Sequence, residues 1–236
     1  MPQWATLDPQ PRLPVRGGPG WQVTPRDIEI LQWVGRHGLV TPEQLGRKFF
    51  RRGKDQIGQR AAYDRIRKLV ELGLLQRLPT FYREPHVLRV TKVGADLAGN
   101  DVGPANLVLS DVRHAIALVD LTEQLLTQTK GAILETEREF RARRHRAMRE
   151  GNARVGKGRI PDAVLTLSNG EPVAVELDLT SKRSRDIERI IISFQYERVK
   201  HVWWFCTSKE ITERVREVVR RRRADDFIEV KLWHPR

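Results

Sequence analysis

Apolar and polar residues alternate through residues 173–179, and this pattern predicts a β-strand with one face of valine and leucine side chains. The other face of that strand carries Glu176 and Asp178. A second apolar run precedes it, and the polar residues 168–171 between the two runs are typical of a hairpin turn. A third carboxylate, Asp162, lies near the start of the first strand. Carboxylates within apolar strands need either a compensating cation or a solvent-exposed face.

Residues 24–100 show the spacing of amphipathic helices followed by two short strands. Thr24 and Thr41 each stand directly before a proline, a combination that is typical of a helix N-cap and first turn. Gln44 completes the sequence pattern of a capping box with Thr41. A third helix is expected over residues 56–72, where apolar side chains recur at helical spacing. Strands at residues 74–78 and 87–91 follow, and a fourth helix begins near residue 91.

Residues 105–236 predict a second domain in which helices and strands alternate. The expected elements are a helix at 109–129, a strand at 132–140, the hairpin, a helix at 182–199, a strand at 201–207, a helix to about 223 and a strand at 226–233. This order indicates a mixed sheet flanked by helices, and therefore an α/β (α+β) domain. In the strand at 132–140, Glu135, Glu137 and Glu139 are expected on one face.

A basic, glycine-containing stretch lies between that strand and the hairpin, at residues 141–159. Its composition argues against a buried element, and we expect a mobile loop near the carboxylates. One interpretation is a flap that binds phosphates, with Arg143, Arg144 and Arg146 as DNA contacts. The other is an ordinary solvated loop.

The balance of charge points to a polyanionic partner. The 236 residues carry a formal charge of +13, the pI is about 10.5, and the apolar content is sufficient for a core. Nucleic acid is the simplest polyanion, because neutralised phosphates release counterions. We find neither a long apolar run nor a signal peptide, so we expect no membrane partner. The single cysteine, Cys206, lies in an apolar run and is expected to be buried in a cytoplasmic, nucleoid-associated protein. Residues 1–23 are rich in proline and glycine and predict a flexible arm.

Three helices followed by a two-stranded wing, as predicted for residues 24–100, resemble a winged helix-turn-helix domain. The outward positions of its third helix carry side chains suited to base edges and phosphates, namely Gln59, Arg60, Tyr63 and Arg67. Arg83 lies in the loop of the wing. Double-stranded DNA is therefore the expected partner, and a homodimer is the oligomer to consider, because such domains often bind paired half-sites. The alternative is a winged helix that contacts protein, or a solvated polar face.

The residues Pro161-Asp162, the turn, and Glu176 resemble the motif of the PD-(D/E)XK restriction-endonuclease-like fold, although Asp178 stands where that motif has lysine. Together with the winged-helix pattern and the helix that contains His114, they resemble the replication-relaxation family over about residues 24–236. The resemblance implies a DNA-binding protein of a plasmid, phage or other mobile element, acting in replication, DNA relaxation and transfer, or transcription regulation. Nuclease activity follows only by analogy of fold.

Two functions remain open at this stage. In a metal-dependent endonuclease or nickase, Asp162 and Glu176 would hold Mg²⁺ or Mn²⁺ with the Leu177 carbonyl, and Glu137 or Glu139 could complete the site. Lys182 would then replace the missing lysine, or Asp178 would act as a further ligand. In a non-catalytic DNA-binding protein, the second domain would serve dimerisation or additional DNA contact. This second function is favoured because Asp178 replaces the lysine of the motif. An anionic side chain beside a phosphate group weakens the binding of DNA.

Overall fold

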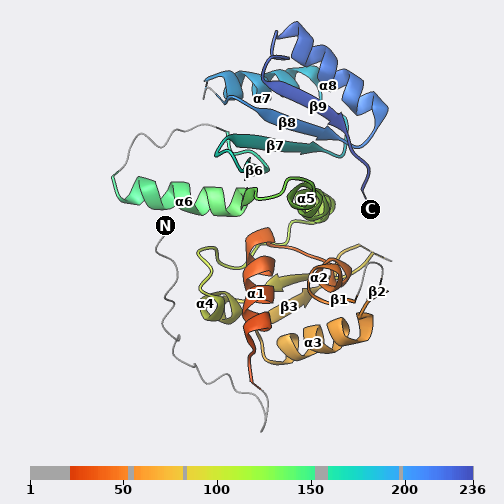
Figure 1. Cartoon of the computed structure of the whole chain (residues 1–236), viewed down its shortest axis with the longest axis vertical. Helices are drawn as coiled ribbons and strands as arrows, with labels where there is room; N and C mark the ends of the chain where they lie inside the picture. Colours follow the sequence, from red (N-terminus) through yellow and green to blue (C-terminus); the bar gives the residue numbers. More distant parts are fainter. Residues whose placement is uncertain (1–21, 53–55, 82–83, 152–158, 197–198, 236) are drawn as a thin grey trace.

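The computed structural model describes residues 22–52, 56–81, 84–151, 159–196 and 199–235. Most of the predicted arm at residues 1–23 lies outside these ranges. The described chain forms a unit of helices and two short hairpins at one end and a five-stranded sheet with its helices at the other (Figure 1). This is the mixed α and β architecture expected from the sequence.

The first unit contains four helices and two small antiparallel sheets. Its elements are α1 (Pro25–His37), α2 (Pro42–Phe49), β1 (Arg51–Arg52), β2 (Gln56–Ile57), α3 (Gln59–Glu71), β3 (Leu75–Leu78), β4 (Val87–Val90) and α4 (Lys92–Ala98). Both predicted helix starts are confirmed, since Thr24 with Asp27 and Thr41 with Gln44 form capping boxes. Helix α3 begins later than expected, because Gln56 and Ile57 pair with β1 instead.

One apolar cluster holds this unit together. It contains Ile30 and Leu31 of α1, Leu45 of α2, and Ile66 and Leu69 of α3, each with an exposed fraction of 0%. Strands β3 and β4 close the cluster, with Leu75 opposite Val90 in an antiparallel register. The apolar sides of the three helices therefore face inward, and the polar side of α3 faces solvent.

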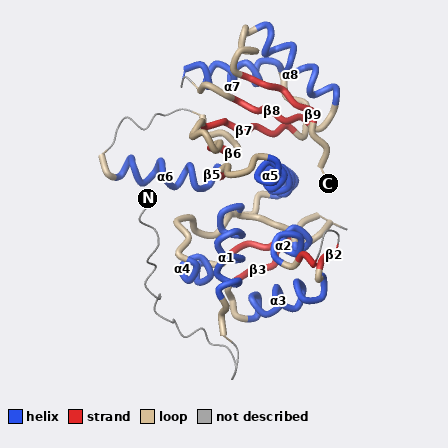
Figure 2. Tube along the Cα trace, in the orientation of Figure 1, coloured by secondary structure: helices blue, strands red, loops and turns tan. Residues whose placement is uncertain are grey.

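The second unit has a sheet in the order β5-β6-β7-β8-β9. Its elements are α5 (Leu109–Gln128), β5 (Ile133–Thr136), α6 (Glu137–Arg149), β6 (Ala163–Thr166), β7 (Pro172–Asp178), α7 (Ser184–Tyr196), β8 (Val202–Cys206), α8 (Lys209–Arg221) and β9 (Ile228–Leu232). Strands β5, β6 and β7 pair antiparallel, whereas β7, β8 and β9 pair parallel. Helix α5 packs on one face of the sheet, and α7 and α8 pack on the other (Figure 2).

Two predictions between α5 and β6 were wrong. The expected strand at 132–140 ends at Thr136, so Glu137 and Glu139 lie in the first turn of a helix rather than on a strand face. The expected loop is also helical up to Arg149. The reason is local, because Thr136 and Glu139 form a capping box and the following arginines and alanines have high helix propensity.

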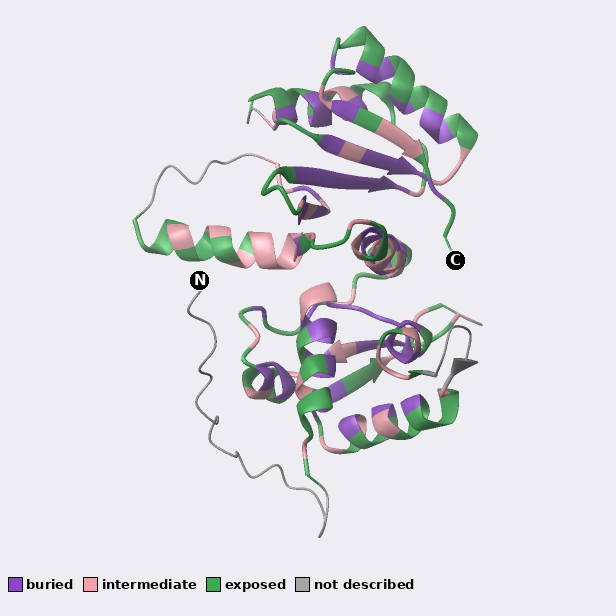
Figure 3. Cartoon of the chain, viewed as in Figure 1, coloured by how far each residue is buried: buried purple, intermediate pink, exposed green. Residues whose placement is uncertain are grey.

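The two units contact each other mainly through α5. The Gln44 side chain donates to the carbonyl of Ile116 at 2.8 Å, and Trp33 Nε1 donates to Glu123 at 2.9 Å. Lys48 forms an ion pair with Glu123 at 2.7 Å. Helix α5 thus lies between the core of the first unit and the sheet, and most of its residues are buried or half-buried (Figure 3).

Candidate carboxylate site and nucleic-acid interface

Strand β7 carries the two predicted carboxylates into the interior. Glu176 and Asp178 have exposed fractions of 0% and 2%, so they do not lie on a solvent-exposed face of the strand. β7 is in fact the central strand of the sheet, flanked by β6 and β8. Ala174, two residues before Glu176, packs against α7 and α8, so the alternation directs both carboxylates towards that side of the sheet.

Glu176 is bound by an arginine that sequence reasoning did not pair with it. Arg159 donates from Nε to Oε1 at 3.0 Å and from Nη2 to Oε2 at 2.7 Å. Burial, and secondly the charge of Asp162, raise the pKa of Glu176 to about 7, while Arg159 opposes this rise. Glu176 therefore titrates near neutrality although it has a cationic partner.

Asp178 has a different cation. Lys182, one turn beyond the strand, forms an ion pair with Asp178 Oδ1. Trp204 Nε1 of β8 donates to the other carboxylate oxygen at 3.1 Å. Lys182 does come to the carboxylates, as the sequence suggested, but its ammonium group is bound to Asp178.

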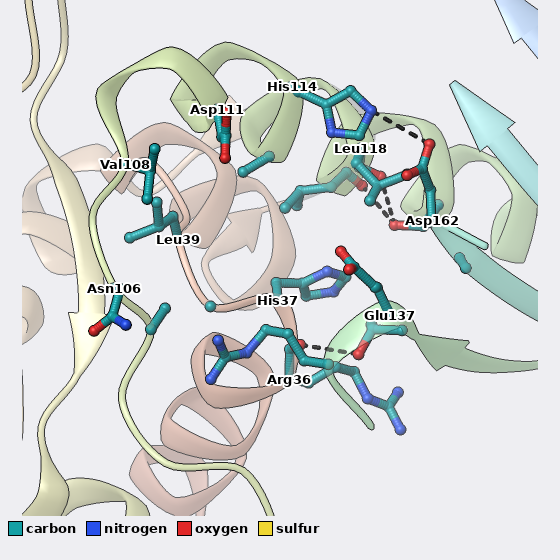
Figure 4. A pocket seen from close by; sticks show the side chains of 18 of the residues that line it. Arg36, His37, Leu39, Asn106, Val108, Asp111, His114, Leu118, Glu137 and Asp162 are labelled. Carbon is teal, nitrogen blue, oxygen red and sulfur yellow. Dashed lines mark hydrogen bonds and ion pairs between the residues drawn. The ribbon is translucent and has the colours of Figure 1, made fainter. Parts of the chain in front are cut away.

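Asp162 lies on the opposite side of β7, next to α5. Its Oδ2 accepts a hydrogen bond from the Leu177 backbone at 2.8 Å. His114 Nε2 lies 3.3 Å from the same oxygen and 3.1 Å from the Leu177 carbonyl oxygen (Figure 4). The hydrogen bond to Asp162 is the main cause of a raised pKa for His114. An imidazolium is thus favoured between two of the oxygens that the sequence proposed as metal ligands.

Glu176 and Asp178 are thus each bound by a cation of the chain itself, and Asp162 is bound by His114. Within the described residues, no three His, Cys, Asp or Glu side chains are arranged so that they could hold a metal ion together. The donor types suit Mg²⁺ or Mn²⁺, but the arrangement does not, because Glu176 faces Arg159 and Asp162 faces His114. The metal site at Asp162, Glu176 and Glu137 therefore stays a prediction.

Asp162 also borders a cavity of about 480 Å³ between the two units. His37, Arg36 and Glu137 line it as well, and Figure 4 shows them with His114 and Asp162. Although Glu137 comes from a helix rather than a strand, it lies close to Asp162, since its backbone N–H donates to the Asp162 carbonyl at 3.2 Å. Burial, followed by the charges of Arg36 and Lys48, lowers the pKa of His37 to about 3, so this histidine is neutral.

The predicted base-reading residues lie on the exposed side of α3. Gln59, Arg60 and Tyr63 are exposed, and Tyr63 donates its hydroxyl to Glu43 at 2.8 Å. Arg67 is exposed but lies between two acids, at 3.2 Å from Asp64 and 3.9 Å from Glu71. Arg83 lies outside the described residues. The surface of α3 is thus polar and accessible, with its charge partly balanced within the helix.

The three arginines expected in a flap lie on α6. Arg143 binds Glu135 at 2.7 Å and stacks over the ring of Phe140, with 4.6 Å to the ring centroid. Arg146 binds Asp101 at 2.9 Å, and Arg144 is half-buried. Arg143 and Arg146 thus bind acids outside the carboxylate site. Arg159, at the end of the same basic stretch, does reach that site, where it binds Glu176. Residues 152–158 of the stretch lie outside the described residues.

Sequence reasoning missed Arg159 as a carboxylate partner and did not assign His114 a contact. A buried Glu176 requires a compensating cation, and this requirement could have pointed to Arg159, which stands two residues before Pro161. His114 is far away in sequence, so only the packing of α5 on the sheet brings it to Asp162.

Comparison with known proteins completes the description. No helix among the described residues combines the length and apolar character needed to cross a bilayer. Neither the search of curated proteins nor that of solved structures found a match to the chain. The model of the family described as replication-relaxation matches residues 31–215, which span the first unit from α1 onward and the second unit into α8. The chain therefore belongs to the replication-relaxation family.

Proposed function

We propose that the protein binds double-stranded DNA of a plasmid, phage or other mobile element through a winged helix-turn-helix formed by α1 to α4 and the β3–β4 hairpin. Family membership supports a role in the replication or relaxation of such elements. The observation that carries the proposal is the exposed polar side of α3, which stands on a rigid apolar core. Its side chains are of the kinds that contact base edges and phosphates in a major groove.

The order of elements in the second unit, apart from the additional α6, supports a PD-(D/E)XK-like fold, and we propose that this unit acts without catalysis. Arg159 binds Glu176, Lys182 binds Asp178, and His114 binds Asp162. The alternative is a metal-dependent endonuclease that uses Asp162 and Glu176. It would require Arg159 to leave Glu176, which loses two charge-assisted hydrogen bonds.

One incubation of supercoiled plasmid with the protein tests both functions. The reactions contain Mg²⁺, Mn²⁺ or a chelator, and the gels report cleavage and mobility shifts together. We expect a shift without nicked or linear product, unchanged in Asp162→Ala and Glu176→Ala and weakened in Arg60→Ala. Metal-dependent cleavage that both carboxylate variants lose would establish the endonuclease instead. The absence of a shift at low salt would contradict DNA binding.

A further inference from the structure

Helix α6 is unusual because it has no apolar face to bury. None of its residues, all of which the structure describes, is buried. Residues 141–149 contain five arginines and one histidine and no acid. A helix that is polar on all sides gains little from packing, which is the usual source of helix stability in proteins.

The start of α6 is nevertheless fixed firmly. Thr136 caps the helix and also donates its hydroxyl to the Arg36 carbonyl at the end of α1, at 3.0 Å. Arg36 binds Glu139 at 2.8 Å, and Arg138 donates to the Gly35 carbonyl at 3.3 Å. The first turn therefore docks on α1, and the rest of the helix extends away from the sheet (Figure 1).

The charges along the extended part oppose its own folding. Arg143 and Arg146 are three residues apart, as are Arg146 and Arg149, and like charges at this spacing destabilise a helix. Arg143 pairs with the half-buried Glu135, whereas Arg146 pairs with the exposed Asp101. Exposed ion pairs of this kind contribute little and exchange readily for a stronger anion. The phosphates of a nucleic-acid backbone would remove the repulsion between the arginines of α6.

We propose that α6 is a second DNA-contacting element, which binds the phosphate backbone without regard to base sequence. This inference rests on the proposed DNA binding and adds to it a surface other than α3. Arginine suits the role, because its guanidinium binds phosphate oxygens through two hydrogen bonds. A protein partner fits less well, since Met148 is the one large apolar side chain exposed on the described helix, and protein interfaces have an apolar centre.

The position of α6 separates this contact from the one on α3. Helix α1 is bonded to α3 at its start, through Asp27 and Arg65, and to α6 at its end, through Arg36 and Thr136. Its 13 residues span roughly 20 Å at 1.5 Å per residue, which is about the width of a duplex. The surfaces of α6 and α3 are therefore separate, and a variant of one leaves the other unchanged.

A salt titration of binding to a mixed-sequence 30-base-pair duplex tests this proposal. The variant Arg146→Gln with Arg149→Gln is compared with Arg214→Gln and Arg216→Gln on α8, which removes the same charge from exposed arginines. A plot of the logarithm of the DNA association constant against the logarithm of the salt concentration has a negative slope. We expect this slope to become shallower by about two for the α6 variant, since each phosphate contact contributes about 0.9. The α8 variant should keep the wild-type slope.

Hydrogen exchange of the full chain gives an independent measurement. Bound duplex should slow exchange of the amides in residues 141–149, and Arg60→Ala should leave that protection in place. Equal slopes for the α6 and α8 variants, or no added protection in α6, would overturn the proposal. If Arg60→Ala has no effect while both α6 results appear, the assignment of α3 fails and that of α6 stands.

Discussion

Arg159 binds the fully buried carboxylate of Glu176 through two hydrogen bonds, from Nε at 3.0 Å and from Nη2 at 2.7 Å. Glu176 lies in the central strand of the sheet, where an unpaired charge has no access to water. The arginine is itself only partly exposed, so solvent screens the pair weakly. The stability of the second unit thus depends on a polar contact as well as on its apolar core.

Substituting Arg159 by alanine should strongly destabilise the fold. Removing one partner of a buried pair leaves an uncompensated charge, and we expect a loss of about 3 kcal/mol in the free energy of unfolding at pH 8. Urea denaturation followed by circular dichroism measures this loss. Arg149→Ala on the exposed side of α6 is the control and should change stability by less than about 0.5 kcal/mol. Similar losses in the two variants would show that the contact with Glu176 contributes nothing.

The raised pKa of Glu176 predicts a definite pH dependence. Its pKa is about 7 in the folded protein and 4.5 in the reference state. Between pH 4.5 and 7 the folded protein therefore binds a proton at Glu176 that the unfolded chain has released. Stability from this group is therefore complete below pH 4.5 and is lost as the pH rises through 7, by about 3 kcal/mol. Glu176→Gln should remove that part of the slope in denaturation curves recorded from pH 4.5 to 8. An unchanged slope in the variant would place the titration elsewhere.

His114 occupies the position that a cation would need between Asp162 and the Leu177 carbonyl. We expect no saturable Mn²⁺ binding by the wild type in calorimetry at pH 7, because the His114 side chain already contacts both oxygens. His114→Ala should bind Mn²⁺ more tightly than the wild type, and His145→Ala on α6 should not. Adding Asp162→Ala to His114→Ala should abolish the gain. Tight binding by the wild type that Asp162→Ala removes would support the endonuclease instead.

The sequence predicted the carboxylate-bearing hairpin well, because alternation in a strand reports directly which side chains share a face. Glu176 and Asp178 are on one face of β7, and Thr24 and Thr41 cap the helices expected from them. The error at residues 132–140 came from the same rule. Glu135, Glu137 and Glu139 alternate as in a strand, but the capping box that begins at Thr136 determined the local structure.

The partners of the carboxylates were harder to predict, because they depend on tertiary packing. Asp162 and His114 are distant in sequence and meet only where α5 crosses the sheet. The burial of Glu176 implied a compensating charge, yet nothing local distinguished a metal ion from Arg159. The proximity of Lys182 to the carboxylates was easier to predict, since Lys182 follows Asp178 by four residues and one short turn separates them.

Arg60 and Arg67 of α3 should differ in their contribution to DNA binding. Both are exposed, but Arg67 lies near Asp64 and Glu71, whereas Arg60 has no ion-pair partner among the described residues. We expect Arg60→Ala to weaken binding by about 1–3 kcal/mol if it contacts a base, or to lower the salt slope by about one if it contacts a phosphate. Arg67→Ala should have the smaller effect, because binding must first break its contacts with the two acids. Fluorescence anisotropy with a labelled duplex measures both variants, and Arg214→Ala on α8 controls for the lost charge. Unchanged affinity in both α3 variants would exclude this helix as the recognition element, whatever the fate of α6.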